Sequence, residues 1–298
     1  MSFRPAAPAA RRRTRQDADR RFGIRLFGSV AVGAVAAVLF GLLLVLVESG
    51  WHPLRRLDAG AARWLNRAAL DHPAWTGTLR FFSDVVWDPV TLRAAVALLT
   101  LWLVYRRAWR LAAWAAVTAV AGGLTGLLAK TVVERARPVL PDPVAHAPGF
   151  SFPSGHAMTA TTSFAILLLV LLPMVRRGLR PLCWAVAAVS VVGVGFTRIA
   201  LGVHWFSDVV GGWMLGLAVV ALTGWSFEAW RADAGMGRTE VAEGLEPELS
   251  GDHPEGPDHE APAPGTSGPE SSGSHPRRSP EHRAEPEGPS GPGSADPR

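Results

Sequence analysis

The sequence predicts an all-α membrane protein, a polytopic helical bundle with about six transmembrane helices, and three observations lead to this prediction. Long apolar runs recur along the first 230 residues, arginines gather beside these runs, and the composition changes abruptly near residue 231. The chain of 298 residues is 48% hydrophobic, yet its mean hydropathy is only +0.17. Such an average is expected when a strongly apolar part and a strongly polar part share one chain.

The apolar runs are long enough to cross a bilayer. The first extends from Leu26 to Val47, 22 residues without a charge, and at about 1.5 Å per residue it spans a hydrocarbon core of about 30 Å. It is too long for a cleavable signal peptide and lacks a small-residue cleavage site. Comparable runs, interrupted only by Arg93 and Arg198, follow at 89–105, 111–129, 157–175, 182–203 and 209–227.

The placement of arginine predicts the orientation of these crossings. Residues 1–25 are strongly basic and are therefore expected to stay in the cytoplasm. Six crossings then place the arginine-rich loops 105–110 and 174–180, together with the C-terminus, on the same side. The segments left on the outer face are 48–88, 130–156 and 198–208.

Segment 48–88 is expected to contain an amphipathic helix that lies along the membrane surface. Within it, the apolar positions of LDAGAARWLNRAAL, residues 57–70, recur at helical spacing.

Residues 231–298 are predicted to form a disordered cytoplasmic tail. They hold 12 of the 24 prolines and no aromatic residue, so they offer too little apolar surface to offset the entropy of ordering. The chain is thus divided into a basic segment 1–25, a transmembrane domain 26–230 and a tail 231–298. The formal charge of +5 comes from arginines beside the membrane, so nucleic-acid binding is not expected.

Three polar clusters fall on the predicted outer face. The first is KTVVERARP, which begins at Lys130, the only lysine of the chain; the second is SFPSGHAM, 151–158; the third is TRIALGVHWFSD, 197–208. Taken singly, the first cluster is explained by a basic side chain that reaches the lipid headgroups, the second by a helix cap, and the third by polar residues in contact with solvent. Taken together they indicate a site, because ionisable residues at membrane depth are costly.

The cations of these clusters predict a phosphate-binding pocket. Lys130, Arg137 and Arg198 would repel one another without an anion, and phosphate suits the bidentate donors of arginine and the point charge of lysine. Ser154 adds a hydroxyl, and Gly155 lets the backbone approach at a helix N-terminus, where anions are favoured.

The remaining residues indicate acid–base and nucleophilic chemistry. His204 and Asp208 are spaced i, i+4, which on a helix brings the carboxylate beside the imidazole and orients it. His156 is a second imidazole, so one ring can attack phosphorus while the other protonates the leaving oxygen. A zinc site built from His156, His204 and Asp208 is the rival interpretation, and the nearby cations disfavour it.

These clusters resemble the signature of the type 2 phosphatidic acid phosphatase superfamily, the membrane lipid phosphate phosphatases. The family pattern reads Lys, six residues, Arg-Pro; then Pro-Ser-Gly-His; then Ser-Arg, five residues, His, three residues, Asp. Here it is KTVVERARP, PSGH and TRIALGVHWFSD, with both spacings intact and Thr197 in place of the usual serine. The resemblance implies an all-helical core of the kind shared with vanadium haloperoxidases, over about 26–227.

The resemblance also implies a reaction and roles for residues. The reaction is metal-independent hydrolysis of a phosphate ester or diphosphate through a phosphohistidine, without a cofactor, on a membrane lipid. His204 would be the nucleophile, Asp208 its orienting partner and His156 the general acid. The phosphoryl oxygens would be held by Lys130, Arg137, Ser154, Gly155 and Arg198. Arg135 does not fit the motif spacing and is expected to contact headgroups or solvent.

Two alternatives stay open: a vanadate-dependent haloperoxidase, and a non-catalytic protein that binds or moves a lipid phosphate. The sequence leaves open the natural lipid, whether polyprenyl diphosphate, phosphatidylglycerol phosphate or phosphatidic acid, and the oligomeric state.

Overall fold

The computed structural model describes residues 30–233, which form helices and no strand. The predicted basic segment 1–25 and all but three residues of the predicted tail lie outside the described residues. A first helix is described from Val30 to Glu48. The later elements are α2 (His52–Asp71), α3 (Pro73–Phe81), the π-helical turn η1 (Phe82–Val86), α4 (Pro89–Tyr105), α5 (Trp109–Val133), α6 (Gly155–Leu171), the 3₁₀ turns η2 (Leu172–Met174) and η3 (Arg177–Leu179), α7 (Arg180–Ala200) and α8 (Phe206–Asp233).

Six helices of the described chain are long and apolar enough to cross a membrane, which confirms the predicted fold class. Each contains most of one predicted apolar run, and most ends differ by a few residues because capping groups determine where a helix begins. The span that contains α4 runs from Pro73 to Tyr105 and so also includes α3 and η1. At α4, for example, the carboxylate of Asp88 accepts hydrogen bonds from the amides of Val90 and Thr91 over 2.7 and 3.3 Å, as an N-cap does. α8 continues to Asp233, three residues past the predicted end of the membrane domain.

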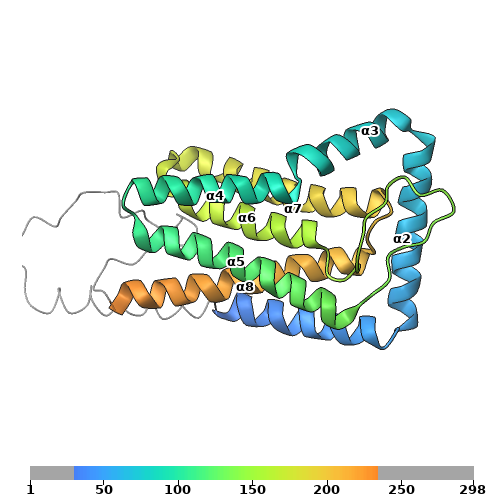
Figure 1. Ribbon diagram of the computed structural model, residues 1–298, viewed down its shortest axis with the longest axis horizontal. Coiled ribbons are helices and arrows are strands. Elements are labelled where there is room, and N and C mark those ends of the chain that lie inside the picture. The colour runs from blue at the N-terminus through green and yellow to red at the C-terminus, as the bar shows by residue number, and fades with distance from the viewer. Residues whose placement is uncertain (1–29, 234–298) are drawn as a thin grey trace, which may run out of the picture. The chain divides into compact units, whose positions relative to one another are not determined.

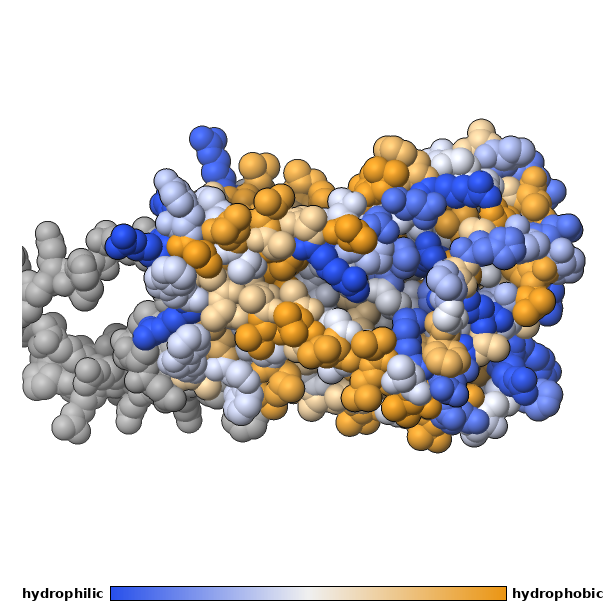
Figure 2. Space-filling view, in the orientation of Figure 1, coloured by the Kyte–Doolittle hydropathy of each residue, from blue (hydrophilic) through white to orange (hydrophobic). Residues whose placement is uncertain are grey.

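The spanning helices run side by side, and α6 lies among α4, α5, α7 and α8 (Figure 1). The α4–α5 and α6–α7 connections lie at one end of the bundle. The loop 134–154 and the turn 201–205 lie at the opposite end, where α2 crosses the bundle. Hydrophilic residues gather over this second end, whereas hydrophobic residues dominate along the helices (Figure 2).

α2 is the amphipathic helix predicted within 48–88. One side is buried against the bundle and includes Ala62, Leu65 and Ala69, while Trp64 on the other side is 69% exposed. The buried side also contains a carboxylate, Asp58, which is 1% exposed. An isolated buried carboxylate is unfavourable, so this residue points to partners on the bundle.

The contact between α6 and α8 is close where the polar clusters meet. A side chain added at Gly212 of α8 would place its Cβ 2.6 Å from the carbonyl oxygen of Ser154, so only glycine fits there. The amide of Ser154 in turn donates to the carbonyl oxygen of Asp208 over 2.9 Å. The start of α6 is therefore fixed against the start of α8.

Candidate functional site

The structure brings the three predicted polar clusters to one end of the bundle, each held at the end of a different helix. Lys130 lies in the last turn of α5 and Arg198 in the last turn of α7. His156 lies in the first turn of α6, after Ser154, which caps that helix, and Asp208 lies in the first turn of α8. Helix ends suit such a site because their last or first backbone groups lack intrahelical partners.

His204 and Asp208 are in contact, but by a different local structure from the one predicted. Nδ1 of His204 lies 3.3 Å from Oδ2 of Asp208, and both side chains are buried. The prediction placed both residues on one helix; instead His204 lies in the turn before α8. Asp208 reaches back to it and also accepts from the amide of Trp205 over 2.8 Å, in the manner of a residue that caps its own helix.

The partners of the His204 ring determine which nitrogen carries the proton. Asp208 can only accept at Nδ1, and Nη1 of Arg137 can only donate to Nε2, over 3.2 Å. The proton therefore lies on Nδ1 and the lone pair on Nε2. Burial lowers the pKa of His204 to about 4, although the hydrogen bond to Asp208 opposes this shift. The imidazole is therefore neutral near pH 7, and Nε2, which accepts from Arg137, is its basic atom.

Arg135 lies inside the site, which corrects the expectation that it contacts headgroups or solvent. Its Nη1 donates to Oδ1 of Asp208 over 2.6 Å and its Nη2 to Oδ2 of Asp58 over 2.7 Å. Its guanidinium also lies over the ring of Trp205, with 5.6 Å between Cζ and the ring centroid. Arg135 and Arg137 are two residues apart in a non-helical segment, a spacing that directs two side chains to the same side of an extended chain.

Asp58, Ser151 and Ser207 are further members of the site that the sequence interpretation missed. Asp58 accepts from the amide and the hydroxyl of Ser207 over 2.9 and 2.6 Å, as well as from Arg135. The hydroxyl of Ser151 donates to Oδ2 of Asp208. A signal for Asp58 was its position as an acidic residue on the apolar side of a predicted amphipathic helix.

Lys130 and Arg137 make hydrogen bonds to backbone carbonyls of the loop before α6. Nζ of Lys130 donates to the carbonyl of Phe150 over 2.8 Å. Arg137 donates to the carbonyls of Pro148, Gly149 and Phe150, and over 2.7 Å to that of Val203. Burial lowers the pKa of Arg137, but an arginine stays charged near neutral pH. Within residues 30–233 neither side chain forms an ion pair with a carboxylate, so Arg137, which lies beside His204, and Lys130 have no neutralising partner there.

Arg198 is a buried cation with an unused donor. Its Nη1 donates to the hydroxyl of Ser83 over 2.7 Å and lies 3.8 Å from a carboxylate oxygen of Asp84, which is largely exposed. Its Nε is buried and has no hydrogen-bond partner in the described part of the chain. The carbonyl of Arg198 accepts from the amides of Val203 and His204, so the same residue also shapes the turn that carries His204.

The start of α6 completes the site. The hydroxyl of Ser154 accepts from the amide of Ala157 over 3.4 Å, and a Cβ added at Gly155 would lie 3.7 Å from Cε of Lys130. His156 is close enough to Arg198, Arg137 and Lys130 to interact with their positive charges. Within residues 30–233, no three side chains of histidine, cysteine, aspartate or glutamate gather as metal ligands would.

A comparison with protein families matches the part of the chain that carries the three polar clusters. Residues 110–232 match the PAP2 superfamily, the type 2 phosphatidic acid phosphatases. The chain is 38% identical over 105 residues to phosphatidylglycerophosphatase B of Bacillus subtilis, a match that covers 34% of this chain and 51% of that protein. It is 28% identical over 146 residues to an undecaprenyl-diphosphatase of Sulfolobus acidocaldarius, which covers 46% of this chain and 61% of that protein. The chain thus spans about half the length of these curated relatives.

A solved structure shares the fold. The crystal structure of a transmembrane PAP2-type phosphatidylglycerolphosphate phosphatase from Bacillus subtilis has a TM-score of 0.59 to this chain, with 21% sequence identity, over 70% of this chain and 98% of that one. At this identity the similarity establishes the fold. The three polar clusters lie at one end of a bundle of six helices that are long and apolar enough to cross a membrane. Residues 110–232, which carry these clusters, therefore form a PAP2 superfamily domain.

Proposed function

We propose that this protein is an integral-membrane lipid phosphate phosphatase that hydrolyses a phosphate monoester or diphosphate of a lipid through a phosphohistidine on His204. The observation that carries the proposal is the arrangement around Nε2 of His204. Oδ2 of Asp208 accepts a hydrogen bond from the other ring nitrogen, Nδ1, over 3.3 Å, and Nη1 of Arg137 lies 3.2 Å from Nε2 itself. A neutral imidazole with its lone pair directed at a group of cations is suited to attack a phosphate.

In the first step Nε2 of His204 attacks phosphorus and the bond from phosphorus to the leaving oxygen breaks. His156 donates a proton to that oxygen, which leaves as the lipid alcohol or, from a diphosphate, as the lipid phosphate. Asp208 stabilises the positive charge that develops on the imidazole, and its own charge is held in place by Arg135 and Ser151. Negative charge on the phosphoryl oxygens is stabilised by Lys130, Arg137, Arg198 and the start of α6 at Ser154 and Gly155.

In the second step water attacks the phosphohistidine. His156, which lost its proton in the first step, accepts a proton from this water, the bond between phosphorus and Nε2 breaks, and inorganic phosphate leaves. His204 then regains its lone pair, and both histidines return to their starting protonation states. The unused Nε donor of the buried Arg198 supports a phosphate ligand, because a buried donor without a partner is unfavourable.

The substrate class is proposed from the relatives and from the membrane location. The relatives are named for phosphatidylglycerol phosphate and undecaprenyl diphosphate, both phosphates carried by membrane lipids, and phosphatidic acid has the same chemistry. We place the site at the outer membrane face and both termini in the cytoplasm, because residues 1–25 and the short loops 105–110 and 174–180 are rich in arginine.

Trapping of the phosphoenzyme tests this proposal. Purified protein in detergent is mixed with phosphate-labelled lipid substrate and quenched without acid, because phosphohistidine is acid-labile, and the label is mapped. We expect label on His204 and complete loss of turnover in His204→Ala. His156→Ala should lose most activity on alkyl monoesters but far less on p-nitrophenyl phosphate, whose leaving group needs no proton. Label on His156, or a phosphoenzyme that persists in His204→Ala, would reverse the roles of the two histidines. Wild-type protein that binds lipid phosphates without releasing phosphate would support the non-catalytic alternative.

A further inference from the structure

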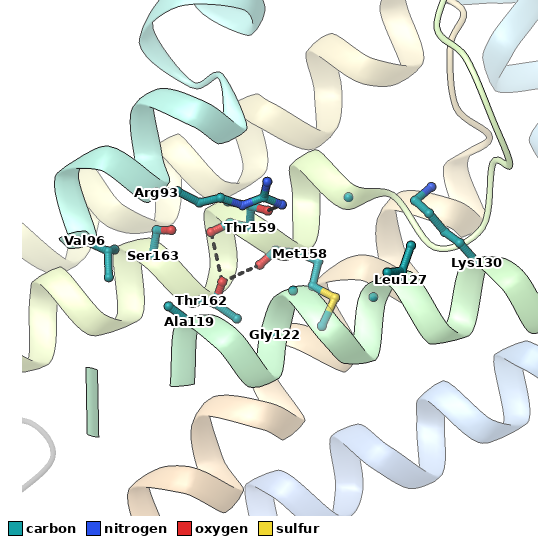
Figure 3. A pocket seen from close by; sticks show the side chains of 13 residues that line it. Arg93, Val96, Ala119, Gly122, Leu127, Lys130, Met158, Thr159, Thr162 and Ser163 are labelled. Carbon is teal, nitrogen blue, oxygen red and sulfur yellow. Dashed lines mark hydrogen bonds between the residues drawn. The ribbon is translucent and has the colours of Figure 1, made fainter. Parts of the chain in front are cut away.

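A cavity of about 170 Å³ extends from the candidate site between α4, α5 and α6. At one end it is lined by Lys130 and Gly155, which belong to the proposed phosphate site. Farther along α6 it is lined by Thr159 and by Arg93 of α4, a residue that the proposed reaction does not use. Figure 3 shows Arg93 and Lys130 on the two sides of this space.

The cavity exists because one side of α5 lacks side chains. Gly122, Gly123 and Gly126 lie on its wall, and a Cβ added at Gly126 would lie 2.9 Å from Sδ of Met158 on α6. A larger residue at that position would therefore push into the space or displace Met158.

Arg93 is a cation without a carboxylate partner in the described part of the chain. Its Nη2 lies 3.4 Å from the hydroxyl oxygen of Thr159 (Figure 3), and no carboxylate oxygen lies within ion-pair distance of it in residues 30–233. It occupies the second turn of α4, within the stretch Pro73–Tyr105 that is long and apolar enough to cross a membrane. A charged side chain in a membrane helix is costly unless it serves a ligand or a partner, and a guanidinium is best matched by a phosphate or carboxylate.

Arg93 of α4 lies beside α6 at the level of Thr159, and this level relates it to the leaving group. Thr159, its partner, follows His156 by three residues, so the two lie on the same side of α6 and are separated by a rise of about 4.5 Å along the axis. His156 is the residue proposed to protonate the leaving oxygen. A group bound by Arg93 therefore lies one helical turn beyond that oxygen, on the side of the leaving group.

We propose that Arg93, with Thr159, forms a second anion subsite that binds a phosphate or phosphodiester group in the leaving portion of the lipid. This inference rests on the proposed phosphatase function and specifies its substrates as lipids with two phosphorus groups. Two lipids supply this chemistry: a polyprenyl diphosphate, in which one bridging oxygen separates the groups, and phosphatidylglycerol phosphate, in which a glycerol unit separates them. Phosphatidic acid and polyprenyl monophosphate have no second anion.

The test compares these substrates in pairs with full-length variants in detergent micelles. For wild type, Arg93→Gln and Arg93→Lys, kcat/KM is measured on two pairs of lipids. The first pair is polyprenyl diphosphate and polyprenyl monophosphate, and the second is phosphatidylglycerol phosphate and phosphatidic acid. For each pair, the ratio of the two kcat/KM values is compared among the three proteins. Arg93→Gln should lose about tenfold to a hundredfold on one or both two-anion lipids, the loss expected when a charge-assisted hydrogen bond is removed. Its loss on the one-anion lipids should stay below about threefold, and Arg93→Lys should recover part of the difference. The pair that responds identifies the source of the anion.

Arg106→Gln, at the opposite end of α4, is the matched control and should leave both ratios unchanged. In Arg93→Gln, an equal loss of kcat/KM on all four lipids would show that Arg93 only supports the fold. No loss of kcat/KM on any of them would show that Arg93 binds no leaving group. Either result overturns the subsite. Failure of the proposed function looks different, because wild-type protein would then release phosphate from none of the lipids.

Discussion

Arg135 and Asp208 form an ion pair of 2.6 Å that joins the loop after α5 to the first turn of α8. The side chain of Asp208 is fully buried, and that of Arg135 is 17% exposed. The second nitrogen of the same guanidinium holds Asp58 of α2 over 2.7 Å. One arginine thus connects the helix that crosses the end of the bundle with the carboxylate that orients His204.

Arg135 and Asp58 are predicted to act as positioning residues. Arg135→Gln and Asp58→Asn each remove one charge from this network, so the carboxylate of Asp208 loses part of its support and holds His204 less well. We expect kcat to fall by about tenfold or more while KM changes by less than about threefold, because neither residue contacts the phosphate. Removing one partner of a buried ion pair also costs about 3–5 kcal/mol of stability, so thermal unfolding should be followed in parallel.

Glu134→Gln is the matched control for this pair, because it removes an exposed neighbouring charge and should leave kcat unchanged. Arg135→Lys should recover part of the lost kcat. A rise in KM with unchanged kcat would mean instead that Arg135 binds substrate.

Lys130→Arg is predicted to impair turnover although it keeps the charge. The ammonium of Lys130 donates to the carbonyl of Phe150 beside Gly155, and a longer planar guanidinium does not fit the same geometry. Loss of a directed donor in a preorganised site commonly costs about 3 kcal/mol, or roughly a hundredfold in rate. We expect a loss of at least about tenfold in kcat/KM at unchanged protein level. Turnover near that of the wild type would show that Lys130 only reaches toward the headgroups.

The acidic limb of the pH profile of kcat/KM should lie at a pH well below the usual pKa range of histidine. Burial lowers the pKa of His204 from 6.5 to about 4, so its Nε2 stays unprotonated, and able to attack, until the pH approaches about 4. The measurement is kcat/KM between about pH 4 and pH 8, corrected for the ionisation of the free substrate, with circular dichroism to verify folding. A limb near pH 6.5 that remains after this correction would argue against a neutral, buried His204 as the nucleophile.

Chelation should leave hydrolysis largely intact, because the charge on the phosphoryl group is proposed to be stabilised by Lys130, Arg137 and Arg198. Vanadate should inhibit, since it takes up the five-coordinate geometry of the phosphorus under attack. The measurement is phosphate release before and after treatment with EDTA, and across a vanadate titration. Activity that EDTA abolishes and zinc or magnesium restores would favour the alternative in which His156, His204 and Asp208 bind a metal.

The candidate site is predicted to face outward. Reporter fusions after Val144, in the loop at the site end of the bundle, and after Gly178, at the opposite end, measure this directly. A reporter that is active only outside the cytoplasm should work at Val144 and fail at Gly178, and a cytoplasmic reporter should show the reverse. Cytoplasmic activity at Val144 would invert the topology and with it the leaflet that supplies the substrate.

The spanning helices were predictable from the sequence because apolar runs of about 20 residues with at most one charge are typical of helices that cross a bilayer. The run at 89–105 became α4 with the same bounds, and the other runs differ from their helices by a few residues at the ends. The amphipathic helix in 48–88 was predictable for a related reason, since apolar residues at helical spacing need an interface. The three motifs were noticed because their polar residues fall together on one predicted face of the membrane, and a phosphate site was inferred because three cations together require an anion.

Tertiary structure decided how these residues hold one another. The i, i+4 spacing predicted a helix through His204 and Asp208, but the turn after α7 places His204 outside α8, and Asp208 reaches back to it. Arg135 was expected at the surface, and Asp58 raised no expectation, because each is a single charge whose partners lie more than 70 residues away along the chain. Spacing along a sequence reports contacts within one helix, whereas a buried ion pair between helices exists only once packing brings the partners together and removes water from both.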